Sequence, residues 1–216
     1  MKTNRRNFEE GVSAAKENGH ILANDPPSNF MAAMITYNQD FLGPKEVDEY
    51  FALLRGETPW EQRSIRIMGR TIPQPRLIAW AGDKPYTYSG LTVNPSPFTP
   101  LLSLLRSEVE LATGASFNSV LLNLYRNGND SIAWHSDDEP ELGPNPTIAS
   151  VSLGATRRFN LKHKTTQETR SLDLAHGSLV LMSGTSQAHW KHSVPKTKAL
   201  VGERINLTFR NLVGSP

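Results

Sequence analysis

Two side chains that commonly bind metals stand two residues apart near the middle of the chain. On an extended segment, His135 and Asp137 project to the same side. Ala133 shares that side, and Ile132 and Trp134 are expected to face apolar packing on the other. With a second histidine, such a pair forms the 2-His-1-carboxylate site of non-haem Fe(II) oxygenases. A His-x-Asp tripeptide alone is weak support, because most occurrences lie on surfaces by chance.

Two downstream histidines compete for the third ligand position. His189 and His192 are three residues apart, so in an extended segment they face opposite sides and are not both expected to bind one metal. We prefer His192 and interpret His189 as a packing or supporting residue, with the reverse assignment still open. The other histidines have no partner pattern and are expected to be structural or exposed: His20, His163 and His176.

A strictly alternating strand follows these histidines. Its polar positions are Arg204, Asn206, Thr208 and Arg210, and apolar residues stand between them. A strand with one face in solvent would give the same pattern. Alternatively, the guanidinium groups grip a carboxylate through paired hydrogen bonds, as a dicarboxylic 2-oxo acid chelating iron at its other end would require. Asn123 and Tyr125, on one face of the predicted strand 120–125, offer further hydrogen bonds to such an acid.

The remaining patterns predict a mainly β protein with flanking helices. Residues 1–30 are polar and aperiodic, which indicates a flexible arm. Apolar spacing predicts helices from Gly43-Pro44 to Gly56 and from Pro100 to Gly114. Many short strands without long helices between them favour a sandwich or jelly roll. Further strands are predicted at 131–137, 148–153, 157–163, 177–182 and 204–211.

Composition narrows the class of protein. The 216 residues are 38% hydrophobic and 20% charged, which fits a soluble single domain. No apolar run is long enough for a membrane span, no signal peptide is recognised and cysteine is absent, so we expect a cytoplasmic location. The net charge of +2 does not mark a nucleic-acid binder. A basic cluster at 155–170 fits phosphate contacts or a solvated hairpin equally well.

These motifs, in this order, resemble the AlkB family of Fe(II)- and 2-oxoglutarate-dependent nucleic-acid dealkylases. The resemblance covers about residues 35–212 and is densest from Asn118 to Arg210. It rests on Asn123-Leu-Tyr125, His135-Ser-Asp137-Asp138-Glu139, Ile148-Ala-Ser-Val-Ser-Leu-Gly154, His192-Ser-Val-Pro195, Arg204-Ile-Asn-Leu-Thr-Phe-Arg210, Pro75-Arg76-Leu-Ile-Ala-Trp80 and Pro85-Tyr86-Thr-Tyr88-Ser-Gly90. It implies a double-stranded β-helix (jelly-roll) core at about 116–212, preceded by a nucleotide-recognition lid at about 57–99, within one domain spanning 31–216.

The resemblance also assigns roles to individual residues. It implies His135, Asp137 and His192 as iron ligands, and it implies 2-oxoglutarate contacts by Asn123, Tyr125, Arg204, Asn206 and Arg210. Tyr88 matches a residue that stacks on the flipped base opposite His135. The other implied substrate residues are Met68, Arg76, Trp80, Tyr86, Asp138 and Glu139. Met68 stands where double-strand-specific relatives carry an aromatic wedge, and an ordinary buried methionine is an equal alternative.

The implied activity is oxidative demethylation of N-alkylated bases such as N1-methyladenine and N3-methylcytosine in DNA. Fe(II), 2-oxoglutarate and O2 are the expected cofactors, and formaldehyde, succinate and CO2 the expected products. A duplex base must leave the stack to reach such a site. We expect a monomer that repairs alkylated DNA, in the cytoplasm or nucleus. One alternative is a related oxygenase acting on RNA, protein or a small molecule, and the other is a metal-free jelly-roll binding protein.

Overall fold

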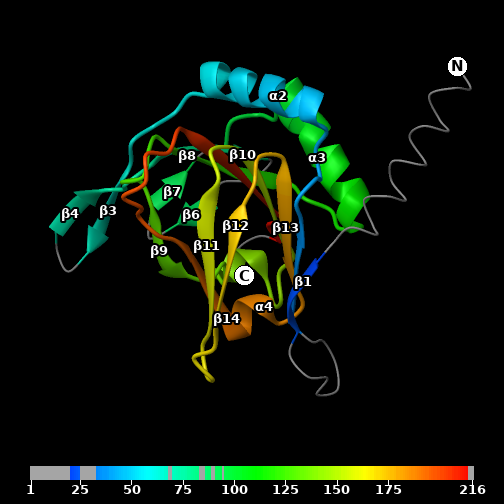
Figure 1. Cartoon of the computed structure of the whole chain (residues 1–216), viewed down its shortest axis with the longest axis vertical. Helices are drawn as coiled ribbons and strands as arrows, with labels where there is room; N and C mark the ends of the chain where they lie inside the picture. Colours follow the sequence, from blue (N-terminus) through cyan, green and yellow to red (C-terminus); the bar gives the residue numbers. More distant parts are fainter. Residues whose placement is uncertain are drawn as a thin grey trace, which may run out of the picture.

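Two antiparallel sheets form the body of the protein, for which a computed structural model describes residues 20–24, 33–67, 70–82, 86–88, 91–93 and 95–213. The seven-stranded major sheet has the order β1 (His20–Asn24), β2 (Met34–Asn38), β13 (Ser178–Ser183), β10 (Ile148–Gly154), β15 (Arg204–Arg210), β8 (Ser119–Tyr125) and β5 (Leu77–Gly82). The four-stranded minor sheet has the order β12 (Thr169–Leu174), β11 (Arg157–His163), β14 (Trp190–Val194) and β9 (Ile132–His135). Figure 1 shows the minor sheet in front of the major sheet. The predicted mainly β, jelly-roll fold is confirmed.

Two helices cover the face of the major sheet that is turned away from the minor sheet. α2 (Pro44–Glu57) and α3 (Pro100–Thr113) each begin with proline in the first turn, where its missing N–H costs nothing. The Thr99 side chain accepts a hydrogen bond from Leu102 N at 3.2 Å and so caps α3. Gly114 ends α3 with a φ of 71°, a conformation that glycine adopts without strain. Both helices match their predicted ranges.

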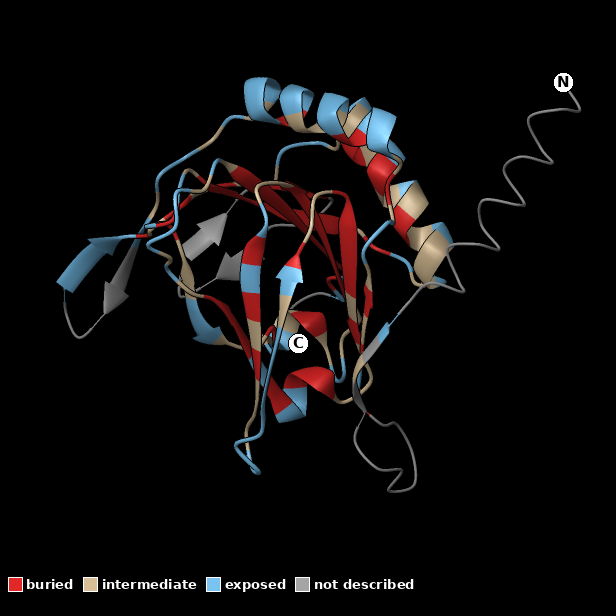
Figure 2. Ribbon diagram, in the orientation of Figure 1, coloured by how far each residue is buried: buried red, intermediate tan, exposed pale blue. Residues whose placement is uncertain are grey.

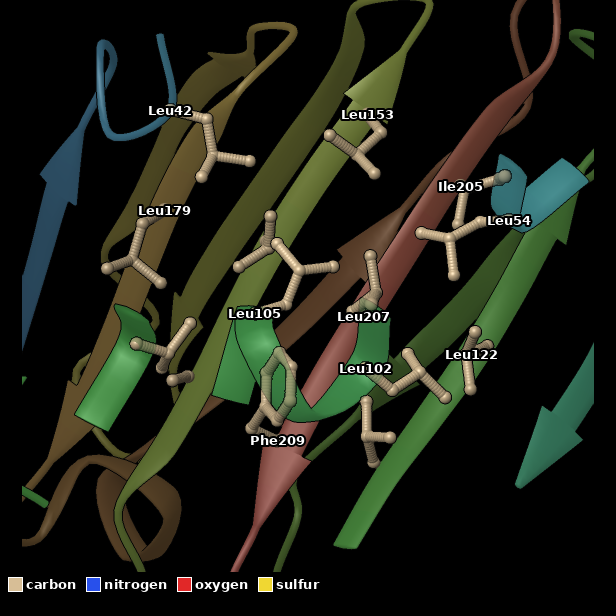
Figure 3. Packing of buried hydrophobic residues seen from close by; sticks show 14 of the residues in the cluster. Leu42, Leu54, Leu102, Leu105, Leu122, Leu153, Leu179, Ile205, Leu207 and Phe209 are labelled. Atoms are coloured by element: carbon tan, nitrogen blue, oxygen red, sulfur yellow. The ribbon is translucent and has the colours of Figure 1, made fainter. Parts of the chain in front are cut away.

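An apolar layer joins these helices to the sheet. Leu54 of α2 and Leu105 of α3 pack against the outward residues of β15 and its neighbours, as Figure 3 shows. The opposite face of the major sheet contacts a second apolar cluster between the two sheets, which includes Trp80, Tyr125 and Phe159. The central strands β10, β15 and β8 are therefore buried along almost their whole length (Figure 2). This burial excludes the alternative of a solvent-facing edge for the arginine strand β15.

A β-bulge interrupts β9, one of the two edge strands of the minor sheet. His135 pairs with His192 and Ile132 pairs with Val194, so two residues of β9 oppose the single residue Ser193. The bulge turns both Ile132 and His135 toward the space between the sheets. The expectation that Ala133 shares the ligand face is therefore wrong. Trp134 was expected in apolar packing and is instead 45% exposed, because regular alternation does not continue through a bulge.

The predicted lid contains two small hairpins and one core strand. β3 (Ser64–Ile67) pairs with β4 (Arg70–Pro73), and β6 (Tyr86–Tyr88) pairs with β7 (Leu91–Val93). Between them, β5 joins the edge of the major sheet beside β8. This segment of the predicted lid is therefore part of the sandwich. Strands β12 and β14 complete the minor sheet, and β14 is preceded by the short helix α4 (Ser186–His189) and followed by the connection to β15.

Parts of the predicted boundaries fall outside the described residues. Within the predicted arm 1–30, the structure describes only β1, which pairs antiparallel with β2. The rest of the arm stays a prediction. None of the described helices combines the length and apolar character needed to cross a membrane.

We predict that Leu105→Ala lowers the free energy of unfolding by about 2–5 kcal/mol, because it leaves a cavity between α3 and the major sheet. The matched control is Leu104→Ala on the same helix, whose side chain is 46% exposed and whose loss is expected to change stability by about 0.5 kcal/mol or less. Urea unfolding of both variants measures the difference. Equal losses would contradict the packing of α3 described above.

Candidate active site

A cavity between the two sheets collects three of the side chains singled out in the sequence. His135, Asp137 and His192 all line it. One ligand atom from each lies within 4.8 Å of the others, close to the spacing that bonds of about 2 Å to one ion require. His135 and His192 come from neighbouring strands, and Asp137 follows β9. Of the two downstream candidates, His192 belongs to this cluster, while His189 is exposed on α4 and packs near His163.

Hydrogen bonding and burial prepare both imidazoles to bind a cation. His135 Nδ1 lies 2.9 Å from the carbonyl oxygen of Ala133, so Nδ1 carries the proton and Nε2 keeps its lone pair. Burial lowers the pKa of His135. Burial and the neighbouring His135 lower the pKa of His192 to about 3. Both rings are consequently neutral at pH 7, which is the form that coordinates metals.

Two contacts hold the carboxylate between the histidines. Burial alone would raise the pKa of Asp137, but Arg210 and both histidines outweigh it and hold the pKa at about 2. Arg210 Nη2 donates to Asp137 Oδ1 at 2.6 Å. Gln187 Oε1 accepts from the backbone N–H of Asp137 at 2.9 Å. Asp137 is thus an anchored carboxylate. Arg210, which was expected to complete the co-substrate pocket, also holds the candidate metal ligand.

A buried cation lies at the opposite end of β15 from Arg210. Arg204 is 1% exposed, and its Nη2 donates to Ser152 Oγ at 2.9 Å. Its guanidinium carbon lies 5.1 Å from the centroid of the Tyr125 ring. Among the described residues no acceptor contacts its Nε or Nη1. Burial lowers the pKa of Arg204 to about 10, so the group stays charged at pH 7 with donors available for an anion.

A network of amides and hydroxyls connects this cation to the rest of the cavity. Asn206 Nδ2 donates to Ser150 Oγ at 2.8 Å, and Thr208 Oγ1 donates to Asn206 Oδ1 at 2.9 Å. Asn123 Nδ2 lies 3.3 Å from Asn206 Oδ1. Arg76 Nε donates to Asn123 Oδ1 at 2.7 Å. These contacts fix the amide orientations on strands β8 and β15.

The cavity therefore offers two kinds of binding group side by side. Two neutral imidazoles and one carboxylate form a donor set suited to Fe(II). The free N–H groups of Arg204 fit one carboxylate of a small dicarboxylic acid. Both kinds of group line the same cavity. The residues present fit the expected metal and co-substrate.

The predicted substrate residues occupy more varied positions. Trp80 is 4% exposed and packs between the sheets, which departs from the expected lid position because β5 joins the major sheet. Arg76 is also buried and donates to Asn123 in the network of amides and hydroxyls rather than facing an open lid surface. Asp138 is exposed and pairs with Lys164 at 3.3 Å. Glu139 is half-buried just before the turn Pro140–Leu142.

Other predicted lid residues are only partly described. Tyr86 and Tyr88 lie on β6, and the structure describes nothing of their side chains. Met68 lies outside the described residues. Substrate contacts remain predictions for these three residues and for the four residues of the preceding paragraph.

Sequence reasoning missed several residues that support the site. Gln187 carries no recognisable pattern, because its role depends on α4 folding back toward Asp137. Ser150 and Ser152 were within reach of prediction, since they alternate with Val151 and Leu153 along β10. A polar alternation on a strand that is otherwise buried indicates partners on the facing side chains.

Comparison with known proteins now identifies the family. A family model described as the 2OG-Fe(II) oxygenase superfamily matches residues 34–210. The human protein named DNA oxidative demethylase ALKBH2 is 40% identical over 184 residues, which are 79% of this chain and 70% of that protein. The chain belongs to the AlkB family of 2OG-Fe(II) oxygenases. The expected Fe(II), 2-oxoglutarate and O2 are confirmed with the family.

One further relative of this AlkB-family chain is similar in sequence, and one solved structure is similar in fold. The Bos taurus protein named alpha-ketoglutarate-dependent dioxygenase alkB homolog 3 is 47% identical over 186 residues, covering 82% of this chain. The chain spans about 65% of the length of that relative. The solved structure of OsALKBH1 aligns with a TM-score of 0.61 and 19% identity, over 82% of this chain and 97% of that chain. That likeness concerns the fold alone.

We predict that the metal-free protein loses stability as the pH falls from 7 to 5. His192 has a pKa of about 3 when folded and 6.5 as its ordinary value, so between these values the unfolded chain binds the extra proton. Stability therefore rises with pH by up to about 1.4 kcal/mol per pH unit for this residue. The low pKa of Asp137 acts in the same direction below about pH 3.8.

Urea unfolding at pH 5, 6 and 7 measures this dependence. His192→Asn is expected to flatten the slope, and the exposed His189→Asn variant serves as the control with the wild-type slope. A His192→Asn slope equal to that of the wild type would contradict the assignment.

Proposed function

We propose that the protein oxidatively demethylates N-alkylated bases in DNA, such as N1-methyladenine and N3-methylcytosine, and thereby repairs them by direct reversal. The observation that carries the proposal is the cavity in which His135, Asp137 and His192 lie beside the unsatisfied N–H groups of Arg204. Relatives that are named DNA oxidative demethylases support nucleobases as the substrate class.

In this proposal the chain supplies placement and charge. Fe(II) with 2-oxoglutarate and O2 supplies the oxidation that hydroxylates the N-methyl group, after which formaldehyde leaves and succinate and CO2 are the co-products. His135, Asp137 and His192 hold the metal. Arg204 and Tyr125 would bind a carboxylate of 2-oxoglutarate. Arg210 keeps Asp137 ionised through their 2.6 Å contact.

The amide network then orients the co-substrate. Asn123 and Asn206 bond to each other, and both are held by residues outside the pair: Arg76 fixes Asn123, and Ser150 fixes Asn206. Amides that are fixed in this way cannot rotate to follow a misplaced ligand. A fixed co-substrate in turn fixes where the methyl carbon must lie, which is the main contribution that positioning makes to rate.

The base is recognised from the lid side in this proposal. Tyr88 stacks on the flipped base opposite His135, and Tyr86 and Met68 contact the strand. Asp138 and Glu139 lie toward the exocyclic amine, where negative charge suits a cationic methylated base. We also propose a monomer acting in the cytoplasm or nucleus.

A substrate panel tests the activity. The protein with Fe(II) and 2-oxoglutarate is given methylated single-stranded DNA, duplex DNA, RNA and a methyl-lysine peptide, and released formaldehyde is measured. We expect release from DNA, and we expect His135→Ala to abolish it because the metal loses a ligand. His189→Ala is the matched control and keeps activity. Release from the peptide or RNA alone, or turnover by His135→Ala, would contradict the proposal.

A second prediction concerns Arg204. Arg204→Met is expected to weaken 2-oxoglutarate binding to the Mn(II)-loaded protein about 100-fold, because it removes a charge-assisted pair worth about 3 kcal/mol. Arg204→Lys should recover part of the affinity, since lysine offers a point charge without the paired geometry. Isothermal titration calorimetry measures both variants. Unchanged affinity in Arg204→Met would place the co-substrate elsewhere.

A further inference from the structure

Positive charge is concentrated in one part of the chain. Between residues 155 and 200 there are eight Lys and Arg residues and two acidic residues, whereas the whole chain has 23 basic and 21 acidic residues. This segment contains three of the four strands of the minor sheet: β11, β12 and β14. The small net charge of the whole protein therefore conceals a basic minor sheet.

Four of these eight basic groups already have hydrogen-bond or ion-pair partners within the protein. Arg157 is 2% exposed and donates to three backbone carbonyls. Arg158 pairs with Asp173, Arg170 pairs with Glu168, and Lys164 bonds to Asp138 and to the Gln187 carbonyl. Arg158, Lys164 and Arg170 therefore fit the solvated-hairpin alternative for this cluster, whereas Arg157 is buried.

Lys162 and Lys191 differ from the other basic residues of this segment because they form a cross-strand pair. They are directly opposite each other on β11 and β14. Their neighbours Leu161 and His192 face the interior, so both lysines face outward. Within the described ranges neither ammonium group has a hydrogen bond or an ion pair. Like charges in such a pair destabilise a sheet, and an anion bound between them would remove that cost.

An exposed indole lies on the next strand. The bulge places Ala133 and Trp134 opposite Ser193, so Trp134 is a diagonal neighbour of Lys191, about 7–8 Å away by sheet geometry. Trp134 is 45% exposed, and among the residues whose side-chain burial the structure describes, no other Phe, Trp or Tyr is exposed to this degree. Figure 1 shows β9 on the side of the minor sheet toward the β3–β4 hairpin.

We propose that Trp134, Lys162 and Lys191 form an outer basic face that binds a single-stranded segment of the nucleic acid flanking the target base. The lysines bind phosphates and the indole stacks on an unpaired base, which is how proteins hold single strands without reading their sequence. The identification of the ligand as nucleic acid rests on the proposed function. The charge pattern itself calls for a polyanion, and the indole favours one that carries bases.

The location of this face relative to the cavity supports the proposal. His135 and His192 face the cavity, while Trp134 and Lys191, their neighbours in sequence, face outward on the same two strands. β9 is one of the two edge strands of the minor sheet. A strand that presents one base to the cavity can therefore pass around this edge and lie on the outer basic face.

Fluorescence anisotropy tests the face without turnover. The probe is a dye-labelled, unmodified oligothymidylate of about 20 nucleotides, added to the full chain without Fe(II) or 2-oxoglutarate. Lys162→Ala/Lys191→Ala should weaken binding about tenfold and reduce the slope of log K against log salt by about 1.4, for two lost phosphate contacts. Trp134→Ala should weaken binding about tenfold through lost stacking, and the oligonucleotide should quench tryptophan fluorescence less in Trp134→Phe.

The matched control removes equal charge from the same segment. Lys196→Ala/Lys198→Ala lies in the loop after β14, where both lysines are exposed, and should keep near wild-type affinity and salt slope. Equal losses in both double variants would overturn the proposal, since charge alone would then explain binding. Unchanged quenching in Trp134→Phe would overturn it too. So would an oligoglutamate peptide that binds this face more tightly than the oligonucleotide.

The outcome is separable from that of the substrate panel. Formaldehyde release from a methylated trinucleotide, which is too short to span both cavity and face, reports on the active site. If the wild-type protein demethylates the trinucleotide but does not bind the oligonucleotide, only the proposal of the outer basic face is contradicted. Face-dependent binding without turnover on any nucleic acid contradicts the proposed function alone.

Discussion

The site depends on the burial of ionised groups inside a β-sandwich, an environment that normally penalises charge. The contact between Arg210 and Asp137 meets this constraint, because it joins the last residue of β15 in the major sheet to the ligand loop that follows β9 in the minor sheet. Breaking one member of such a buried pair leaves an uncompensated charge, which costs far more than the pair contributes. The carboxylate is therefore held ionised and in one place before any metal binds.

The two sheets contribute different groups to the site. The major sheet is packed on one side by α2 and α3 and on the other by the inter-sheet cluster, so the polar residues of β8, β10 and β15 have little freedom to move. The minor sheet contributes the histidines near its edge, supported by a shorter hydrogen-bond ladder. The polar residues proposed to contact the co-substrate thus lie on the most buried strands, and the two candidate histidine ligands lie on the edge strand β9 and its neighbour β14.

The sequence predicted those features that depend on local periodicity. Alternation from Arg204 to Arg210 predicted the inward polar row, and apolar spacing with Gly114 predicted both helices. Features set by long-range pairing were missed. The side chain of Arg76 reaches Asn123 only because β5 adds to the edge of the major sheet, and the same pairing buries Trp80. The bulge decides which of Ile132 and Ala133 faces the cavity. No residue type in β9 indicates that a bulge is present.

The bulge in β9 also has an evolutionary consequence. The bulge adds one residue between Ile132 and His135. A substitution in the bulge therefore need not be accompanied by a change at the ligand position. A substitution at Ala133 or Trp134 alters what the edge of the protein presents to its surroundings, while the pairing of His135 with His192 is preserved on the other side of the same strand. Substitutions at these two positions can therefore change the outer contacts of the protein, while the candidate metal ligand next to them keeps its place in the strand.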